Sequence, residues 1–482
     1  TKSGSNTLTL SATNSYEGNT TISEGAVSIT NDRNLGAIPA TLDSDNIIIS
    51  NGATLATGNE NVTIHANRGI YIASGTATLL KYSRKTWTLN NPISGDGGIN
   101  FSDSTAVGGD GGGGGRFQLN AANTYLGNST IYYAGDKDPG IVINNALALQ
   151  NSTLIYDSSN IPNIASKWYL VIFASNATLG GLEGNLTNGR QFNIGSASIT
   201  IGNNNSNNTF SGNIIGSGNI IKAGSGTLTL NGANTYTGST TVSEGTLKLG
   251  TSNRISDSSA LIINGVFDLN GFSETVGSIA GTGRITSSSS GTTIIQTGGN
   301  NTSTIFSGIV EDGSATSVSL TKLGSGTLTL SGTNTYTGLT TISQGTLYIT
   351  NTSGLGNAST GTTVLDGAAL ELSGGITIGA EALTLNGTGI SSGGALRNVS
   401  GDNSYAGLIT QSSNSIINSD SGTLTLDVTS GNAITGTYNV SFGGSGNITV
   451  EDPIDTGSGT LTKDGSGTLT LSARNEYTGA TT

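Results

Sequence analysis

His65 is the only histidine among 482 residues, so any chemistry that needs an imidazole depends on it. A Ser-His-Asp hydrolase would use it as the general base. The one Gly-x-Ser-x-Gly sequence, Gly389–Gly393, could supply the nucleophile, but such an elbow needs a helix after it. Here Gly394 follows, and the next residues alternate like a strand. We therefore expect a surface position for His65 and no catalytic residue. With one histidine and no cysteine, we also expect no metal site.

Paired carboxylates are the second chemistry to consider, because glycoside hydrolases bring two acidic groups together on one face. The closest pairs in the sequence are Asp43/Asp45, Asp136/Asp138, Glu311/Asp312 and Glu451/Asp452. Asp43 and Asp45 could point the same way from a strand, but they alternate with Ser44 and Asn46 in a turn-like phrase. We expect all these acids to be solvated turn residues. A polysaccharide-degrading enzyme, lyase or hydrolase, is the alternative function.

The glycine-rich run from Gly108 to Arg116 contains one aspartate, Asp110. Calcium-binding β-rolls need aspartates that recur regularly, and one aspartate does not meet that need. A phosphate-binding P-loop needs Gly-Lys-Ser/Thr, which does not follow here. We expect this run to be a flexible protrusion, and we expect no cofactor.

Charge and composition limit the possible partners. The formal net charge is −12, charged residues are 10% of the chain, and no run of basic residues exists. A nucleic acid or an anionic membrane surface would therefore find no electrostatic partner. The 75 glycines would suit a disordered chain, but the apolar residues recur with a clear period, which indicates a folded one. Methionine is absent even at position 1, so we expect a piece of a longer precursor.

Short alternating strands are the repeating element. In Thr227–Leu230 the leucines face one way and the threonines the other, which predicts buried Leu228 and Leu230 and outward threonines. No helical spacing holds for ten residues. Strand-turn units of about 20–25 residues continue along the chain, a pattern typical of a parallel β-helix. We predict one continuous all-β solenoid over residues 1–482, with a possible loop or insertion at 134–174.

A long phrase recurs within these units. GSGTLTLNGANTYTGSTT, from Gly224, returns from Gly324 and Gly465, opens the chain from Gly4, and recurs in worn form from Gly113. Each copy contains an Asn-x-Tyr-x-Gly turn. The turn residues are Asn14, Tyr16, Gly18, Asn123, Tyr125, Gly127, Asn234, Tyr236, Gly238, Asn334, Tyr336, Gly338, Asn475, Tyr477 and Gly479. Because the copies lie far apart, we expect each tyrosine to act as a structural clamp over its own turn. A ladder of exposed tyrosines for sugar stacking is the alternative.

The full pattern is Lys-x-Gly-x-Gly-Thr-Leu-Thr-Leu, the Asn-x-Tyr-x-Gly turn, Thr-Thr and a Gly-Thr-Leu strand. It resembles the passenger-associated transport repeat of bacterial autotransporters. Lys2, Lys222, Lys322 and Lys463 hold its lysine position. The resemblance implies a right-handed parallel β-helix, displayed on or released from the surface of a Gram-negative bacterium. It also implies an outer-membrane barrel in the same precursor.

From the resemblance and the absence of an acid–base constellation, we expect a non-enzymatic passenger that acts in adhesion or in an extracellular fibre or coat. Its expected partner is a host-cell, glycan or neighbouring-cell surface, at an extracellular, outer-membrane-associated location. The chain starts and stops inside matching repeat phrases. We therefore expect either further coils of the same precursor or end-to-end self-association, because open coils expose unpaired strand edges.

Overall fold

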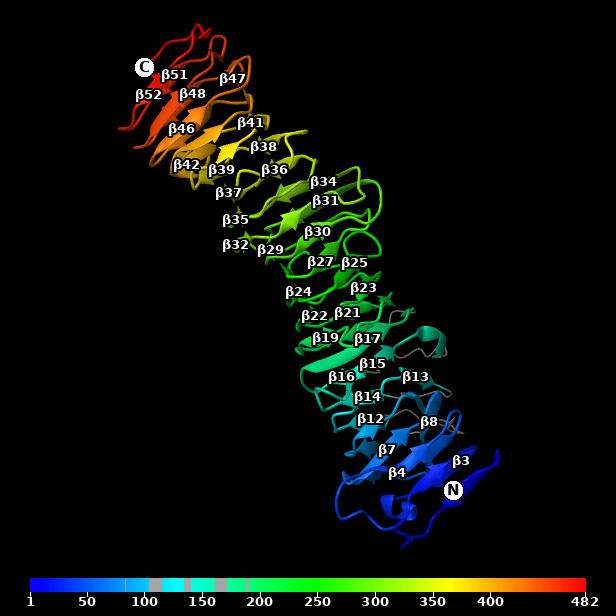
Figure 1. Cartoon of the computed structure of the whole chain (residues 1–482). Helices are drawn as coiled ribbons and strands as arrows, with labels where there is room; N and C mark the ends of the chain where they lie inside the picture. Colours follow the sequence, from blue (N-terminus) through cyan, green and yellow to red (C-terminus); the bar gives the residue numbers. More distant parts are fainter. Residues whose placement is uncertain (83, 104–114, 134–139, 161–170, 188–189) are drawn as a thin grey trace. The chain divides into compact units, whose positions relative to one another are not determined.

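The computed structural model describes residues 1–82, 84–103, 115–133, 140–160, 171–187 and 190–482 (Figure 1). Within these residues the protein is all-β, and parallel strands stack as a β-solenoid of about 19 turns. The only helical segments described there are three 3₁₀ turns: η1 (Asp32–Leu35), η2 (Ser158–Asn160) and η3 (Ile390–Ser392). The predicted fold class is confirmed.

The strands form two compact units, and each is described by itself. Unit 1 comprises Thr1–Ser239 and Ser243–Leu247, and unit 2 comprises Thr240–Val242 and Lys248–Thr482. Strand β25 (Thr246–Leu249) is divided between them.

The longest sheet of unit 1 contains ten strands that pair in parallel. Their order is β1 (Thr7–Leu10), β3 (Ala26–Ile29), β5 (Thr54–Thr57), β8 (Thr76–Lys81), β11 (Gly98–Asp103), β13 (Ser129–Tyr133), β15 (Leu149–Ile155), β17 (Ala177–Glu183), β19 (Ile199–Ile201) and β22 (Ile220–Lys222).

Shorter parallel sheets form the other faces of unit 1. One is β2 (Thr20–Ile22), β4 (Asp43–Ile49), β7 (Arg68–Ile72) and β10 (Ile93–Ser94). Another is β6 (Val62–Ile64), β9 (Trp87–Leu89), β12 (Arg116–Leu119), β14 (Gly140–Ile143) and β16 (Val171–Phe173). Unit 1 also contains two pairs of parallel strands. They are β18 (Gln191–Asn193) with β21 (Asn213–Ile215), and β20 (Asn208–Phe210) with β23 (Thr227–Leu230).

Three long sheets dominate unit 2. The β28–β50 sheet has β28 (Glu274–Val276), β31 (Thr292–Thr297), β34 (Ser317–Lys322), β36 (Thr340–Ile342), β38 (Thr362–Val364), β41 (Leu383–Leu385), β44 (Ile409–Gln411), β47 (Ile434–Thr435) and β50 (Ile454–Asp455). The β32–β51 sheet has β32 (Thr304–Phe306), β35 (Thr327–Leu330), β37 (Gly345–Ile349), β39 (Ala368–Ser373), β42 (Leu396–Ser400), β45 (Ser415–Ser419), β48 (Val440–Gly443) and β51 (Leu461–Lys463). The β40–β52 sheet has β40 (Thr377–Ile378), β43 (Asn403–Tyr405), β46 (Thr423–Leu426), β49 (Asn447–Val450) and β52 (Leu469–Leu471).

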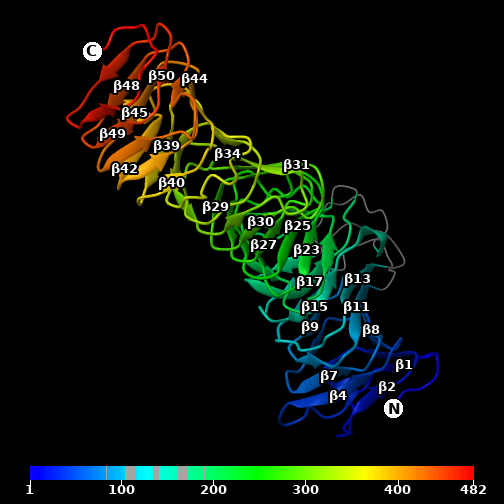
Figure 2. The same cartoon turned by 45° about the horizontal axis from the view of Figure 1, so that its top comes forward.

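Two smaller groups of strands also belong to unit 2. They are β24 (Thr240–Val242), β26 (Ala260–Ile263) and β29 (Ser278–Ala280), then β27 (Val266–Asp268), β30 (Arg284–Thr286) and β33 (Ile309–Val310). Figure 2 shows β39, β42, β45 and β48 following one another along one face of this unit.

The period-2 pattern places the core as predicted. Leu228 and Leu230 of β23 are 1% and 0% exposed, and Leu328 and Leu330 of β35 are 2% and 0% exposed. The threonines between them are half-buried and face outward. The core is therefore a narrow apolar column that each coil fills with two or three side chains per strand.

Two predictions fall partly outside the described residues. Of the predicted protrusion Gly108–Arg116, residues 108–114 lie outside them, and Arg116 begins β12. Of the predicted insertion at 134–174, residues 134–139 and 161–170 lie outside them. The described remainder contributes β14, β15 and β16 to the sheets of unit 1. The single-solenoid organisation and the insertion stay predictions.

Candidate functional site

Lys222 is a fully buried lysine at the end of β22. The alternation that buries Ile220 also turns the lysine side chain into the core. Its Nζ donates to the carbonyl oxygens of Ala223, Gly224 and Glu244 at 2.6, 2.7 and 3.2 Å. We call this set of three backbone oxygens a carbonyl cage. It matches the three N–H groups of an ammonium, and Glu244 lies in the following coil.

Lys322 repeats this geometry in unit 2. Its Nζ donates to the carbonyl oxygens of Leu323, Gly324 and Gln344 at 2.7, 2.8 and 3.2 Å. Burial lowers the pKa of Lys222 and of Lys322 to about 8. Each cage therefore holds a costly cation in the core in order to join two successive turns.

The first and last copies of the repeat keep the same lysine. Lys2 Nζ donates to the carbonyl oxygens of Ser3, Gly4 and Glu24 at 3.0, 2.5 and 3.1 Å. Lys463 Nζ meets two carbonyl oxygens, at 2.6 and 3.0 Å. The sequence analysis recorded these lysines only as motif positions. In β22 and β34 the lysine follows a buried core residue by two positions, so the strand alternation predicts that it points inward. This spacing was the signal that could have located the cage.

The turn asparagine connects neighbouring coils. Asn334 Oδ1 accepts from the backbone N–H of Val310 at 2.9 Å, and its Nδ2 donates to the carbonyl of Gly354 at 2.8 Å. These two partners lie 24 residues before and 20 residues after it. One amide side chain therefore bridges three successive coils.

The other copies place their asparagines similarly. Asn123 Oδ1 accepts from the N–H of Ile93 at 2.8 Å, and its Nδ2 donates to a carbonyl at 2.9 Å. Asn234 and Asn475 each accept from a backbone N–H of the preceding coil, at 2.8 and 2.9 Å. Asn14 donates to the carbonyl of a residue in the following coil at 2.7 Å.

The repeat tyrosines lie inside the core in the internal copies. Tyr125 is 1% exposed, and Tyr236 and Tyr336 are 0% exposed. Tyr336 shares a hydrogen bond of 2.7 Å with Thr340, four residues later. Burial raises the pKa of Tyr125 to about 12 and that of Tyr336 still further. Such rings cannot stack on a sugar.

The same hydroxyl contact recurs in other copies. Tyr125 reaches Ser129 at 2.6 Å, and the tyrosines of the first and last copies make the same contact. Tyr16 reaches Thr20 at 2.8 Å, and Tyr477 OH and the hydroxyl four residues later are 2.9 Å apart.

The glycine of the turn allows close approach between coils. A Cβ added at Gly238 would lie 2.1 Å from the carbonyl oxygen of Gly218, and one at Gly338 would lie 2.4 Å from that of Val318. Gly127 and Gly479 are equally crowded by backbone, whereas Gly18 has open space around it.

One departing copy, Asn403–Gly407, shows what the motif threonine does. Ile409 stands four residues after Tyr405, so the tyrosine has no hydroxyl to meet. Among the described residues, the buried Tyr405 hydroxyl and Glu381 Oε2 have no hydrogen-bond partner. Glu381 Oε1 accepts from Thr362 Oγ1 at 2.8 Å, and burial raises the pKa of Glu381.

Arg68, fully buried in unit 1, is satisfied by its surroundings. Its Nε donates to Asp32 Oδ1 at 3.0 Å, and one terminal nitrogen donates to Asn46 Oδ1 at 2.5 Å. Three backbone carbonyls between residues 35 and 37 accept its other bonds. Buried Lys81 likewise lies 2.9 Å from Asp103. These are paired buried charges of the kind that stabilise a fold only when their hydrogen bonds are complete.

The residues considered for a Ser-His-Asp hydrolase lie in different units. His65 is exposed directly after β6, in unit 1, and its Nδ1 accepts from the N–H of Asn67 at 3.1 Å. Ser391 lies in the 3₁₀ turn η3 of unit 2 with a φ of 51°, and a strand rather than a helix follows.

The acidic pairs serve local structure. Asp43 and Asp45 lie in the extended strand β4, so the turn assigned to them was wrong; the irregular pairing of β4 between Asp43 and Ile47 hides the strand from its sequence pattern. Asp43 Oδ2 accepts from Asn46 at 2.9 Å. Asp136 and Asp138 lie outside the described residues, as does Asp110.

The two remaining pairs also hold turns. Glu311 accepts from Arg284 at 2.9 Å, while Asp312 accepts from the N–H of Val318 and from Thr337 Oγ1, both at 2.7 Å. In the pair Glu451/Asp452, the Asp452 carboxylate accepts from a backbone N–H at 2.7 Å. Across the described ranges, no group of three or more His, Cys, Asp or Glu side chains could hold a metal ion.

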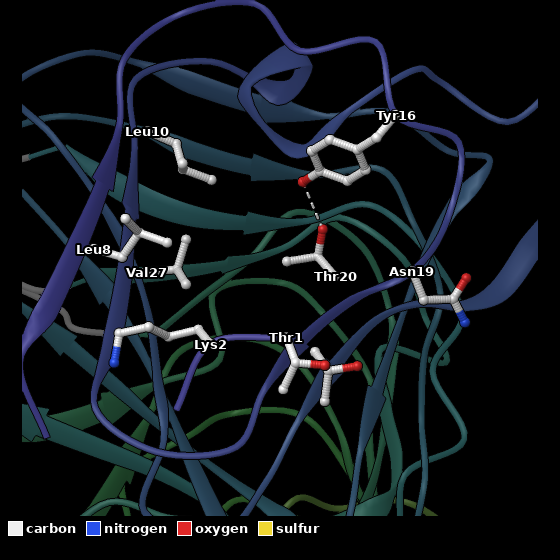
Figure 3. Close-up of a pocket in the computed structure, with 9 residues that line it drawn as sticks. Thr1, Lys2, Leu8, Leu10, Tyr16, Asn19, Thr20 and Val27 are labelled. Carbon is white, nitrogen blue, oxygen red and sulfur yellow. Dashed lines mark hydrogen bonds between the residues drawn. The ribbon is translucent and has the colours of Figure 1, made fainter. Parts of the chain in front are cut away.

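A hollow of about 290 Å³ lies at the first coil (Figure 3). Its lining is Thr1, Lys2, Leu8, Leu10, Tyr16, Asn19, Thr20, Thr21 and Val27. Leu8 and Tyr16 are 43% and 40% exposed, although equivalent residues of internal copies are buried. The hollow is thus an uncovered core surface, and it has no carboxylate in its lining. None of the helical segments described is long and apolar enough to cross a membrane.

Comparison with known protein families identifies the repeat. The passenger-associated-transport-repeat family matches residues 1–29, 220–249, 320–349 and 461–482. The worn copy from Gly113 and the departing copy at Asn403–Gly407 are not among these regions. No curated protein and no solved structure matches the chain. The four matched copies lie within the parallel β-solenoid, and they are consistent with an autotransporter passenger domain that carries such repeats.

Proposed function

We propose that this chain is a surface-displayed, non-enzymatic passenger that acts in adhesion or as part of an extracellular fibre or coat. One observation supports the proposal most directly: the lysine, asparagine and tyrosine of the repeat make their contacts within the core or between neighbouring coils. The Lys322 cage, the Asn334 bridge and the buried Tyr336 all point inward or between coils. The motif therefore builds a scaffold, and the working surface is the outward rows of the strands.

The repeat family supports export. The matched repeats suggest delivery to the cell surface or the medium, with linkage to an outer-membrane barrel in the same precursor. We propose a Gram-negative bacterium as the host, and a host-cell, glycan or neighbouring-cell surface as the partner.

Non-enzymatic action is supported by the arrangement of the candidate acids. Glu311 is paired with Arg284, and Asp312 and Asp452 accept from backbone N–H groups. A carboxylate that holds a turn in this way is poorly placed to work as an acid–base pair with a second one.

The test separates adhesion from turnover. Beads coated with the purified chain should attach to cells or glycan surfaces, and the chain should release no reducing sugar or unsaturated product from polysaccharides. Turnover that disappears on Asp43→Asn or Glu451→Gln would replace this proposal by the enzyme alternative. Absence of attachment together with absence of fibres would contradict adhesion and coat formation alike.

A further inference from the structure

The β28–β50 sheet of unit 2 carries a continuous outward row of threonines. Register pairs Thr321 with Thr341, Thr341 with Thr363, and so on strand by strand. The members, which we call the threonine row, are Thr321, Thr341, Thr363, Thr384, Thr410 and Thr435. They come from β34, β36, β38, β41, β44 and β47, which follow one another along one side of unit 2 in Figure 1, where all but β44 are labelled. Neighbouring strands place one hydroxyl and one methyl group about every 4.8 Å.

The hydroxyls of this row are available to a ligand. Within the described residues, none of the six makes a hydrogen bond to the protein. Buried threonines of the same strands behave differently, since Thr340 bonds Tyr336 and Thr362 bonds Glu381. Each free hydroxyl can donate one hydrogen bond and accept two.

Along the strands, the row is flanked by uncharged residues. The residues two positions before and two positions after each threonine include no acidic or basic side chain, and the row ends at Asp455 of β50, which pairs with Thr435. Leu339, Leu365 and Leu408 lie at these flanking positions and are 42%, 39% and 41% exposed. The strip therefore combines hydroxyls, methyl groups and leucine side chains over six successive strands.

The other long faces of unit 2 differ in charge. In the β32–β51 sheet the outward row includes Glu371 and Arg397, which form an ion pair of 3.0 Å. In the β40–β52 sheet the outward row is Thr377, Ser404, Thr425, Thr449 and Thr470. Asp402, Asp427 and Glu451 lie two residues from members of that row. Among these three sheets of unit 2, which is described throughout, only the threonine row combines free hydroxyls with uncharged flanking residues along its strands. Its one charged neighbour in register is Asp455, beside the last member, Thr435.

We propose that the threonine row binds a neutral, extended polysaccharide of β-linked sugars. Such a chain presents hydroxyls along its edges and apolar ring faces, and its sugar rings advance by a distance similar to the strand spacing. Sugar hydroxyls would pair with the threonines, and ring faces would cover the methyl groups and the three leucines. An acidic polysaccharide is disfavoured, because the chain's net charge is −12 and the row offers no cation.

This inference rests on the proposed adhesive function and names its ligand class. The test measures binding of the purified 482-residue chain to suspended cellulose and chitin particles by co-sedimentation. One variant combines Thr341→Lys, Thr384→Lys and Thr435→Lys, which alternate along the row so that the new charges are not adjacent. The matched control combines Thr377→Lys, Thr425→Lys and Thr470→Lys on the acid-flanked row.

The row variant should bind at least about tenfold more weakly, since it removes three hydroxyl contacts and buries a charge against the ligand. The control should bind like the unmodified chain. Thr341→Val, Thr384→Val and Thr435→Val together keep the shape and remove only hydroxyls, and they should also weaken binding. Far-UV circular dichroism of every variant should match the original.

Other outcomes would contradict polysaccharide binding by the threonine row. Equal binding by the row and control variants, or no binding of the unmodified chain to either polymer, overturns this inference. A dimer in sedimentation velocity that only the row variant dissolves, without polymer binding, would assign the row to a second copy of the chain. Cell attachment that survives in the row variant would leave the adhesive function standing and remove this ligand.

Discussion

Replacing Lys322 by methionine tests whether the carbonyl cage stabilises the solenoid. Methionine keeps most of the side-chain length and removes the ammonium, so three buried carbonyl oxygens lose their donor. Hydrogen bonds to a charged donor are worth roughly 1.5–3 kcal/mol each. Against this, the lowering of the Lys322 pKa from 10.5 to about 8 corresponds to about 3 kcal/mol of desolvation that the variant avoids. We expect a net loss of about 2–5 kcal/mol.

The pH dependence of this loss has a definite sign. Lys322 has a lower pKa in the folded chain than in the unfolded chain, so folding releases a proton between pH 8 and pH 10.5. The free energy of unfolding of the original chain therefore rises with pH in that window, relative to the Lys322→Met variant. The stability difference between the two proteins should be larger at pH 10 than at pH 7.

Urea unfolding followed by far-UV circular dichroism measures both effects. Hydrogen exchange of peptides from residues 317–349 shows whether the loss is local, as expected for coils that contact only their neighbours. Lys248→Met is the matched control, because Lys248 makes a partly exposed ion pair with Asp268 at 3.6 Å and an exposed hydrogen bond to Ser288 Oγ at 2.9 Å, and it should cost less than about 1 kcal/mol. Equal stability of the Lys322→Met variant and the original chain would refute the cage, and a pH-independent difference would refute the titration argument.

Four further substitutions in unit 2 test the coil interior and its outer face. Leu328→Ala should cost about 2–5 kcal/mol and Thr329→Ala under about 1 kcal/mol in urea unfolding, and equal costs would mean that the strand phase is wrong. Tyr336→Phe should cost about 1 kcal/mol through loss of the bond to Thr340, and an unchanged urea midpoint would show that this bond contributes nothing. Glu381 has a pKa above its unfolded value, so the original chain loses stability as pH rises through the folded pKa. Glu381→Gln should therefore lose less stability over the same rise in pH. Parallel plots of the free energy of unfolding against pH for the two proteins would rule out a contribution from Glu381.

The core and the fold class could be predicted from sequence because period 2 is a local signal. Leu228 and Leu230 are buried for the same reason that their threonine neighbours are outside, and no distant contact is needed to see it. The turn residues could be found because they recur in a fixed phrase. Their contacts could not, since Asn334 meets groups 24 residues before and 20 residues after it.

Two features went against single-residue preferences. Lysine is almost never fully buried unless paired, so composition gives no reason to place Lys322 in the core. Only its position two residues after Leu320 in the alternating strand β34 indicates that Lys322 is buried. Asp43 and Asp45 have turn-like neighbours, and the strand that contains them is set by pairing with β7 rather than by local propensity.

The direction of the motif's contacts explains why the repeat can recur at long intervals. Each copy joins its own coil to the coils immediately before and after it, through Asn334 in one case and through the lysine cage in another. A copy therefore does not need a second copy in register, and intervening coils can vary. The departing copy supports this, because its Asn403 still accepts from the N–H of Ile376 at 2.8 Å although Tyr405 has lost its threonine. The contacts that join coils point inward or between coils, so they place no demand on the outward rows. Binding specificity in such a chain should therefore be sought in rows such as Thr321–Thr435, which the repeat phrase only partly specifies.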